Sequence, residues 1–497
     1  MKRFTALTVA VLIEVAGVGT LRAEEGHDVD PASVDDVTLA LSRLAIETEG
    51  DEIPESAYRA AKAALLDALG CAYAGHDAPG VPEVVGLTKQ WGGRAEATVW
   101  FDGAKVPAPE AAFANSVQLH ALDFDDYHPP SDAHVTAVLV PTILAVGQLH
   151  GASGKETLAA LIVGTEVVGR LGRVYKARRE HKGFLPTSVI GGFGATAAAC
   201  RLQGCSVEQT VDAMGIWYAH ASGTRQALFD HTLTKRIQPG IAARAGTLAA
   251  RLAGEDFTGP GRIIGGRTAA LTRIYGCRRD AKPPTVAEVM APEDAWQIEQ
   301  LHYKRCACCG VCGRAIDSAV ELATRHDLKP EDVKEVRLFG ADIQSPFGGV
   351  AWADSRTPQV LAQFCVPYAA ASAIKNRCYG PAQIAPRRIA EDEEVDALAR
   401  RTRMCEWREW EGHRPKAHTG MQVFLRDGRR LDDARDSHQR YRWPEDNEKL
   451  LAKFGRNVAF SGLLDKPATE EMILAIEDLD ACTNIADFIK QRLVIKQ

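Results

Sequence analysis

The sequence of 497 residues lacks the features that mark nucleic-acid, nucleotide or membrane proteins. Its formal net charge is only −6 and both signs are mixed, so no basic surface for nucleic acid is expected. It has no P-loop and no glycine-rich dinucleotide fingerprint, which leaves ATP and NAD chemistry without support. Repeats, low-complexity tracts and heptads are absent too. Its composition, 46% hydrophobic and 25% charged, is that of an ordinary globular protein. We expect neither a nucleic-acid partner nor a membrane.

Residues 1–33 are a segment whose nature the sequence leaves open. A basic start, an apolar stretch and Leu21-Arg22-Ala23 before an acidic run resemble a secretory signal. The apolar stretch is interrupted by Glu14 and is too short to span a membrane. Twelve cysteines argue against export, because an oxidising compartment would expose them to oxidation. We predict a leader or disordered segment. The protein is exported if residues 1–23 are a true signal peptide, and cytoplasmic otherwise.

Residues 34–279 are predicted to form an all-helical bundle domain. Its first helices carry apolar residues at i, i+3, i+4 and i+7, and Gly75 suits a helix C-cap. The later helices are rich in small residues and nearly free of charge, which is typical of buried helices in close contact. A short hairpin around Asp102-Gly103 interrupts them. The segments with helical patterns are 37–47, 55–75, 136–151, 154–172 and 191–204.

Residues 280–442 are predicted to form a smaller α+β domain. Residues 443–497 return to a helical pattern, and we expect this tail to pack back on the helical domain. The predicted fold class is therefore mainly α, with an all-helical bundle domain plus a smaller α+β domain. The segments of the second domain are 315–326 and 361–376, both helical, and the strand-like 333–340 and 421–433, the last turning at Asp427-Gly428.

The stretch HALDFDDYHPPSDAHVTAVLVP, residues 120–141, is the densest in groups that titrate or bind metals. Two prolines after His128 end any helix there, so the acidic end, His128 and His134 are expected on an irregular loop between buried helices. Loops held by a rigid scaffold often carry catalytic groups. A metal site and a capped, solvated helix end are the alternatives, although no fixed ligand spacing such as H-E-x-x-H is present.

Two further clusters carry polar or reactive side chains. The loop 222–246 brings Lys235 and Arg236 beside glycine and proline breaks, which suits carboxylate binding; ordinary surface charge is the alternative. Four cysteines between positions 306 and 312 invite an iron–sulfur or zinc interpretation. Ile316 stands where the fourth cysteine of a ferredoxin run would be, and no second cluster completes a zinc site. Small buried residues leading into a helix are therefore favoured, and we predict no metal.

A series of motifs in order resembles the MmgE/PrpD family, whose members include 2-methylcitrate dehydratase, cis-aconitate decarboxylase and iminodisuccinate epimerase. The motifs are HALDFDDYH, GFLPTSV, TKRIQPG, KRCACCGVCGRAID and VLAQFCVPYAAAS, and the resemblance extends from about residue 35 to residue 460. It implies a helical domain, a smaller α+β domain and a site in the cleft between them. It also implies a homodimer that acts on a small di- or tricarboxylate without a metal or an organic cofactor.

The family's functional residues can be carried over only where its motifs match. The acidic motif falls on Asp123, Asp125 and Asp126, the loop histidine best matches His134, and the lysine motif falls on Lys235. We predict three catalytic residues, Asp123, His134 and Lys235. The residues predicted to bind substrate are Asp126, Tyr127, His128 and Arg236.

The chain also departs from the family pattern. Leu185 stands where the family usually has a histidine, and Cys306 stands where it often has a tyrosine. Gly310 replaces a basic residue, and Gly313 replaces another histidine. Part of the usual acid–base and carboxylate-binding set is therefore missing, which puts the standard dehydratase activity in doubt.

The predicted function is that of a cofactor-independent lyase, similar to 2-methylcitrate dehydratase, which removes a proton next to a carboxylate and expels water. Either Asp123 or His134 would be the base, and Lys235 would pair with a substrate carboxylate and with the developing negative charge. A decarboxylase or epimerase of the same family stays open, because these reactions differ in substrate placement. A catalytically altered member that only binds polycarboxylates is a further alternative.

We predict that Lys235→Ala and His134→Ala each abolish turnover and leave the fold intact, because each removes a group that handles charge or protons. The measurement is a panel of di- and tricarboxylates, followed by absorbance of the unsaturated product and by carbon dioxide release. Circular dichroism of each variant tests the fold. Full activity in both variants would contradict this site.

Overall fold

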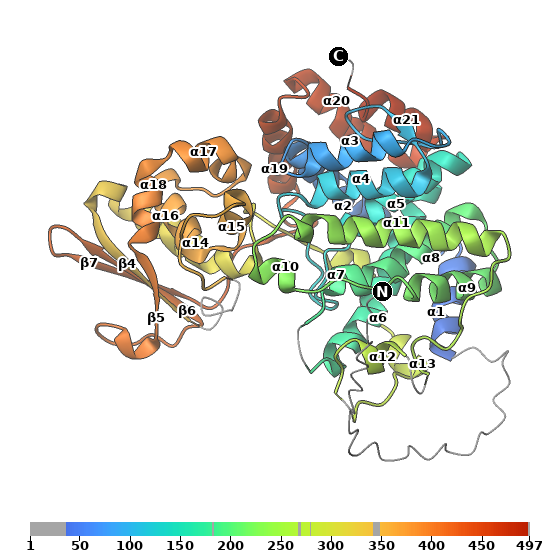
Figure 1. Cartoon of the computed structure of the whole chain (residues 1–497), viewed down its shortest axis with the longest axis horizontal. Coiled ribbons are helices and arrows are strands. Elements are labelled where there is room, and N and C mark those ends of the chain that lie inside the picture. Colours follow the sequence, from blue (N-terminus) through green and yellow to red (C-terminus); the bar gives the residue numbers. More distant parts are fainter. Residues whose placement is uncertain (1–35, 181–182, 267–269, 279, 341–347, 496–497) are drawn as a thin grey trace, which may run out of the picture. The chain divides into compact units, whose positions relative to one another are not determined.

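The computed structural model describes residues 36–180, 183–266, 270–278, 280–340 and 348–495. The predicted leader, residues 1–33, lies outside the described residues. The predicted fold class is confirmed, since a large helical part is followed by a smaller part that combines helices with a sheet (Figure 1).

The helical part contains the helices predicted from the apolar spacing and others that were not predicted. Among these is the 21-residue α11 (Thr234–Gly254), which occupies much of the expected loop 222–246, so Lys235 and Arg236 lie on a helix. A small hairpin follows α3, with Ala97 opposite Val106 and a turn at Gly103, whose φ is 83°. The elements are α1 (Asp36–Glu47), α2 (Glu55–Gly75), α3 (Val81–Trp91), β1 (Ala97–Thr98), β2 (Lys105–Val106), α4 (Ala108–His120), α5 (Thr136–His150), α6 (Gly154–Arg178), α7 (Pro186–Val189), α8 (Gly191–Gln203), α9 (Val207–Tyr218), α10 (Gln226–Phe229), α11 (Thr234–Gly254), α12 (Leu271–Ile274) and α13 (Val286–Val289).

Small residues let these helices approach closely, as the sequence predicts. A Cβ placed on Gly194 of α8 would lie 2.5 Å from the carbonyl oxygen of Gly164 in α6. Gly75 also lies at a close contact between helices. The prediction that it caps the C-terminus of α2 is wrong. His76 is the C-cap of α2, in a right-handed conformation. A Cβ on Gly75 would instead collide with the Gln118 carbonyl oxygen, so this glycine permits contact between α2 and α4.

The α+β part is built on a four-stranded sheet with the order β5-β4-β6-β7. Strands β4 and β5 are parallel, and β6 is antiparallel to both β4 and β7. The predicted turn at Asp427-Gly428 joins β6 to β7. The predicted helix over 361–376 divides in two at Cys365, two residues before Pro367. The elements are β3 (His302–Tyr303), α14 (Gly313–His326), β4 (Val333–Gly340), α15 (Pro358–Phe364), α16 (Val366–Asn376), α17 (Pro386–Glu391), α18 (Glu393–Arg400), β5 (Thr402–Cys405), β6 (Thr419–Leu425), β7 (Arg430–Arg435) and β8 (Tyr441–Arg442).

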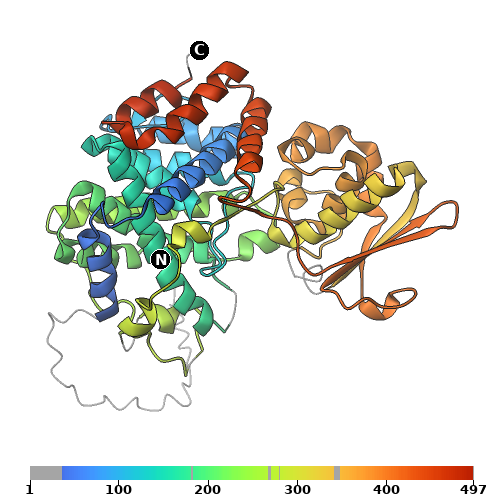
Figure 2. The same ribbon diagram turned by 180° about the vertical axis from the view of Figure 1, so that it is seen from behind.

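The tail packs against the helical part. It forms α19 (Asn447–Ser461), α20 (Lys466–Glu477) and α21 (Ile485–Arg492), and α19 packs along α2 (Figure 2). This contact includes an ion pair that is almost fully buried, 2.7 Å between Lys453 Nζ of α19 and Asp67 Oδ1 of α2. None of the helices in the described ranges is long and apolar enough to cross a membrane.

We expect Gly194→Ala to lower the free energy of unfolding by about 1–3 kcal/mol, because the added methyl group overpacks the contact between α6 and α8. Chemical denaturation monitored by circular dichroism measures the change. The matched control is Gly455→Ala in α19, where a Cβ meets nothing within 4 Å. That variant is expected to gain up to about 1 kcal/mol from helix propensity. Equal stability of the two variants would contradict the close contact.

Candidate active site

The predicted loop lies between α4 and α5, and three of its four carboxylates are buried. Asp123 and Asp125 are 3% and 0% exposed, which rules out a solvated helix end for these two side chains. The backbone of Asp123 is left-handed, with φ of 50°, a conformation that aspartate tolerates better than most residues. Between the two, the Phe124 carbonyl oxygen accepts a hydrogen bond of 2.8 Å from Lys453. The tail helix α19 therefore fixes the loop from behind.

Two lysines from distant parts of the chain meet at Asp123. Lys235, in the first turn of α11, is paired with Asp123 Oδ1. Lys304, which follows β3, donates to Asp123 Oδ2 at 2.8 Å and to its carbonyl oxygen at 2.7 Å. Burial by itself would raise the pKa of Asp123, but Lys235 and Lys304 outweigh it and hold this pKa well below its usual range. Asp123 is therefore ionised, and it is a weak base.

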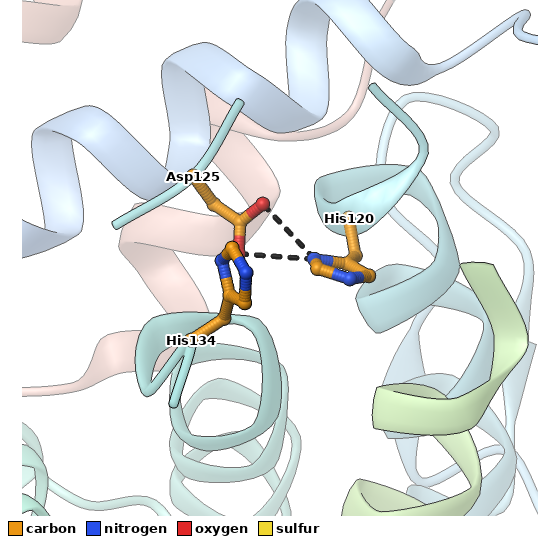
Figure 3. Close-up of side chains that lie close together, drawn as sticks. All are labelled: His120, Asp125 and His134. Atoms are coloured by element: carbon orange, nitrogen blue, oxygen red, sulfur yellow. Dashed lines mark hydrogen bonds and ion pairs between the residues drawn. The ribbon is translucent and has the colours of Figure 1, made fainter. Parts of the chain in front are cut away.

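Asp125 lies between two imidazoles (Figure 3). His120 Nδ1 is 2.9 Å from Asp125 Oδ1, and His134 Nδ1 is 3.2 Å from Asp125 Oδ2. Burial and the Lys235 charge lower the pKa of His120 to about 4, although Asp125 opposes this shift. His120 is therefore neutral at pH 7, with its proton on Nδ1 facing Asp125. Its Nε2 then accepts from Lys235 Nζ, 2.5 Å away.

His120, Asp125 and His134 are also a group whose ligand atoms lie within 4.8 Å of one another, close enough to surround a metal ion. In the described part of the chain, the four cysteines at 306–312 do not form such a group. Within the first group, Asp125 is shared by both imidazoles and Nε2 of His120 faces the Lys235 ammonium. A cation placed among them would meet that positive charge, which disfavours metal binding.

These side chains open onto a cavity of about 370 Å³. Positive charge exceeds negative charge on its walls, because five lysine or arginine side chains line it with only two carboxylates. Lys235 and Arg314 lie in the first turns of α11 and α14, where the helix dipole adds positive potential. The cavity is therefore suited to a small anion of several charges. The lysines and arginines are Arg225, Lys235, Lys304, Arg314 and Arg440; the carboxylates are Asp123 and Asp132.

The cavity also has an apolar side. Leu185, Leu228 and Phe364 line it and pack in one hydrophobic cluster with Cys309. Leu185 is the residue that replaces a family histidine, so here the change puts a hydrocarbon surface where an imidazole is expected. Burial raises the pKa of Cys309 to about 11, so its thiol is not a nucleophile at neutral pH.

The predicted site residues fall into two groups. Asp123, His134, Lys235 and Tyr127 line the cavity. The Tyr127 hydroxyl donates to Asp132 at 2.7 Å, so the hydroxyl hydrogen is already used within the protein. The side chain of Tyr127 also lines the cavity.

Three predicted substrate-binding residues lie outside the cavity and are bound by protein groups. Asp126 accepts from the backbone N–H groups of Val135 and Thr136 at the start of α5, at 3.0 and 2.9 Å. His128 is 0% exposed and pairs with Ser131. Arg236 donates to Gln359 at 2.7 Å and to the Pro79 carbonyl oxygen. These contacts occupy polar atoms of the three side chains that would otherwise bind a substrate.

The sequence prediction left out three residues of the charged cluster: His120, Asp125 and Lys304. His120 belongs to the quoted stretch, five residues before Asp125, and the acidic motif includes Asp125. The sequence therefore pointed to both His120 and Asp125. No local feature shows, however, that Asp125 rather than Asp126 contacts the imidazoles. Lys304 is the first residue of the quoted KRCACCGVCGRAID motif, which is the signal that could have found it. It lies 181 positions from Asp123, so no sequence spacing pairs the two.

Comparison with known proteins identifies the family. The MmgE/PrpD N-terminal domain model matches residues 40–280, and the MmgE/PrpD C-terminal domain model matches residues 306–480. Together these models span the helical part, the α+β part and the start of the tail. The chain belongs to the MmgE/PrpD family.

Three relatives are similar to part or most of this chain. The cis-aconitate decarboxylase-like protein oryM of Aspergillus oryzae is 27% identical over 65% of this chain and 69% of its own length. The cis-aconitate decarboxylase of Aspergillus terreus is 24% identical over 91% of this chain and 95% of its own length. That of Mus musculus is 31% identical, but over only 43% of this chain and 44% of its own.

We expect Asp125→Asn to lower turnover by about 10³- to 10⁴-fold, because a neutral amide no longer fixes the His120 tautomer or orients the His134 ring. Steady-state kinetics measures the loss. The matched control is the adjacent Asp126→Asn, which is expected to cost roughly 0.5–2 kcal/mol of stability at the start of α5, with a much smaller effect on turnover. Equal kinetic losses in both variants would contradict the separate roles of the two carboxylates.

Proposed function

We propose that this protein is a lyase that acts on a small tricarboxylate, and that its reaction is a decarboxylation of a substrate like cis-aconitate. The observation that carries the proposal is the cavity, in which an excess of lysine and arginine surrounds a buried carboxylate–imidazole–lysine cluster. Relatives named cis-aconitate decarboxylase, one of them similar over 91% of this chain, support the choice of reaction.

The reaction places two demands on the site. The bond from the methylene carbon to its carboxylate breaks, carbon dioxide leaves, and the electron pair forms a new carbon–carbon double bond. The electron pair of the original double bond then takes up one proton at the carbon on its far side. The site must therefore stabilise negative charge on the carbon framework and deliver one proton.

Lys235 meets the first demand. An ammonium group has three N–H donors, and in Lys235 two of them face Asp123 and His120. The third is free to face the cavity that the side chain lines, where it would pair with a substrate carboxylate and with the developing charge. In this proposal Asp123 is a positioning residue, because its ionised carboxylate holds both Lys235 and Lys304.

His134 meets the second demand. Its side chain is 17% exposed, so it can exchange protons with solvent. Its Nδ1 lies 3.2 Å from Asp125 Oδ2, a contact that orients the ring for proton transfer. A substrate carboxylate held against Leu185 and Phe364 would be poorly solvated, and its conversion to neutral carbon dioxide relieves that cost.

Dehydration of a hydroxylated substrate such as 2-methylcitrate stays a prediction of the family resemblance, as do epimerisation, a non-catalytic binding role and the homodimer. The names of the relatives favour decarboxylation over dehydration in this proposal. The three predicted substrate-binding residues outside the cavity have no part in this proposal.

We expect the purified protein to release carbon dioxide from cis-aconitate and, in deuterium oxide, to place one deuterium on a product carbon for each molecule released. Headspace analysis of carbon dioxide and mass spectrometry of the product measure this. His134→Gln is expected to retain binding and lose at least about 10²-fold in turnover, because it removes the proton donor.

Each alternative has its own result in the same assay. Consumption of 2-methylcitrate with rising absorbance and no carbon dioxide would replace decarboxylation by dehydration. Binding of both compounds with no turnover would support the non-catalytic role. Undiminished carbon dioxide release by His134→Gln would contradict the assignment of the proton donor.

A further inference from the structure

One wall of the cavity comes from a segment that the charged cluster does not use. The chain from the end of β7 to β8 passes over the start of α14 and places His438 and Arg440 on the cavity wall. Neither residue belongs to the motifs quoted in the sequence analysis. Both are half-buried, so their side chains are held by the protein.

The Arg440 guanidinium is fixed on one edge and open on the other. Its Nε donates to His438 Nε2 at 2.8 Å, and its central carbon lies 4.7 Å from the centre of the Tyr127 ring. Among the described residues no carboxylate pairs with it, whereas Arg225 on the same cavity lies 3.4 Å from Asp132. Its terminal N–H groups therefore lack an anionic partner in the described part of the protein.

His438 holds Arg440 as a neutral acceptor. Burial, followed by the positive charges of Arg440 and Arg314, lowers the pKa of His438 to about 3. The ring is therefore neutral at pH 7, and because Nε2 accepts from Arg440 Nε, its proton lies on Nδ1. We treat His438 as a positioning residue.

Two glycines make room for this pair. A Cβ on Gly313, the first residue of α14, would lie 2.5 Å from Cδ2 of His438. A Cβ on Gly310 would lie 3.3 Å from Nη2 of Arg440. These are two of the positions at which the chain departs from the family pattern. The imidazole and the guanidinium that the chain lacks at 313 and 310 are thus replaced by side chains from residues 438 and 440.

We propose that Arg440, positioned by His438 and by the Tyr127 ring, binds one carboxylate of the substrate, so that the cavity selects tricarboxylates over dicarboxylates. The inference rests on the proposed function, because it assigns part of the binding of that same substrate. An arginine fork suits a carboxylate, which it can bind through two parallel hydrogen bonds.

Binding of unreactive compounds tests this separately from catalysis. The probes are tricarballylate, a saturated tricarboxylate, and glutarate, a dicarboxylate of similar length, titrated by calorimetry into the unaltered protein and into Arg440→Gln, Arg440→Lys and Arg442→Gln. Arg442 is the matched control, because it lies two residues further along the same segment, is exposed and does not line the cavity.

We expect Arg440→Gln to weaken tricarballylate binding by about 10- to 100-fold and glutarate binding by less than about 3-fold. Arg440→Lys keeps the charge without the planar fork, so its affinity for tricarballylate is expected to fall between those of Arg440→Gln and the unaltered protein. Arg442→Gln is expected to bind both probes as the unaltered protein does. Equal effects of Arg440→Gln on both probes, or no effect on either, would overturn the inference and leave the proposed function standing. Failure of the unaltered protein to bind or turn over any tricarboxylate would overturn both.

A second variant reaches the same pair without changing charge. Gly313→Ala forces the His438 ring to move and should weaken tricarballylate binding selectively, in the same direction as Arg440→Gln. Its control is Gly86→Ala in α3, where a Cβ meets nothing within 4 Å. Unchanged selectivity in Gly313→Ala would contradict the positioning role of His438.

Discussion

The structure of the site depends on the neutralisation of buried carboxylates by lysines. Removing a carboxylate from water costs several kcal/mol unless a cation and hydrogen bonds compensate, so a loop that buries Asp123 can exist only where its partners meet. Those partners come from three separate places: Lys235 from α11, Lys304 from the entry to the α+β part, and Lys453 from the tail, which binds the loop backbone at Phe124. The fold brings the three lysines together, and each binds a different oxygen atom of the loop.

This constraint explains why neighbouring residues have different roles. Asp123 organises the lysines, Asp125 organises the imidazoles, and Asp126 satisfies the start of α5. The same separation holds on α11, where Lys235 lines the cavity while Arg236 ties the helix to other parts of the chain. The apolar side of the cavity then supplies a low-polarity surface within reach of the charged one, and the proposed decarboxylation would use both.

Local patterns in the sequence predicted many of the long helices and the hairpins, because apolar spacing and turn residues act over a few positions. They did not predict α4 or α11. They also placed His134 and Lys235 at one site with the help of the family motifs. They could not separate Lys235 from Arg236, since adjacent residues on a helix point about 100° apart and the facing partner is unknown from sequence. Likewise, His438 fills the space above Gly313 from 125 positions further along, a relation that only the folded chain contains.

The anchoring of the loop by Lys453 has a consequence for biosynthesis. Domains generally fold in order as the chain leaves the ribosome, and here most of the helical part is synthesised long before its last support. Until α19 is available, Asp67 and the Phe124 carbonyl oxygen lack the ammonium group that joins them. The nascent helical part must therefore wait with an incomplete interior while the whole α+β part is made. Shielding by a chaperone would matter most during that interval.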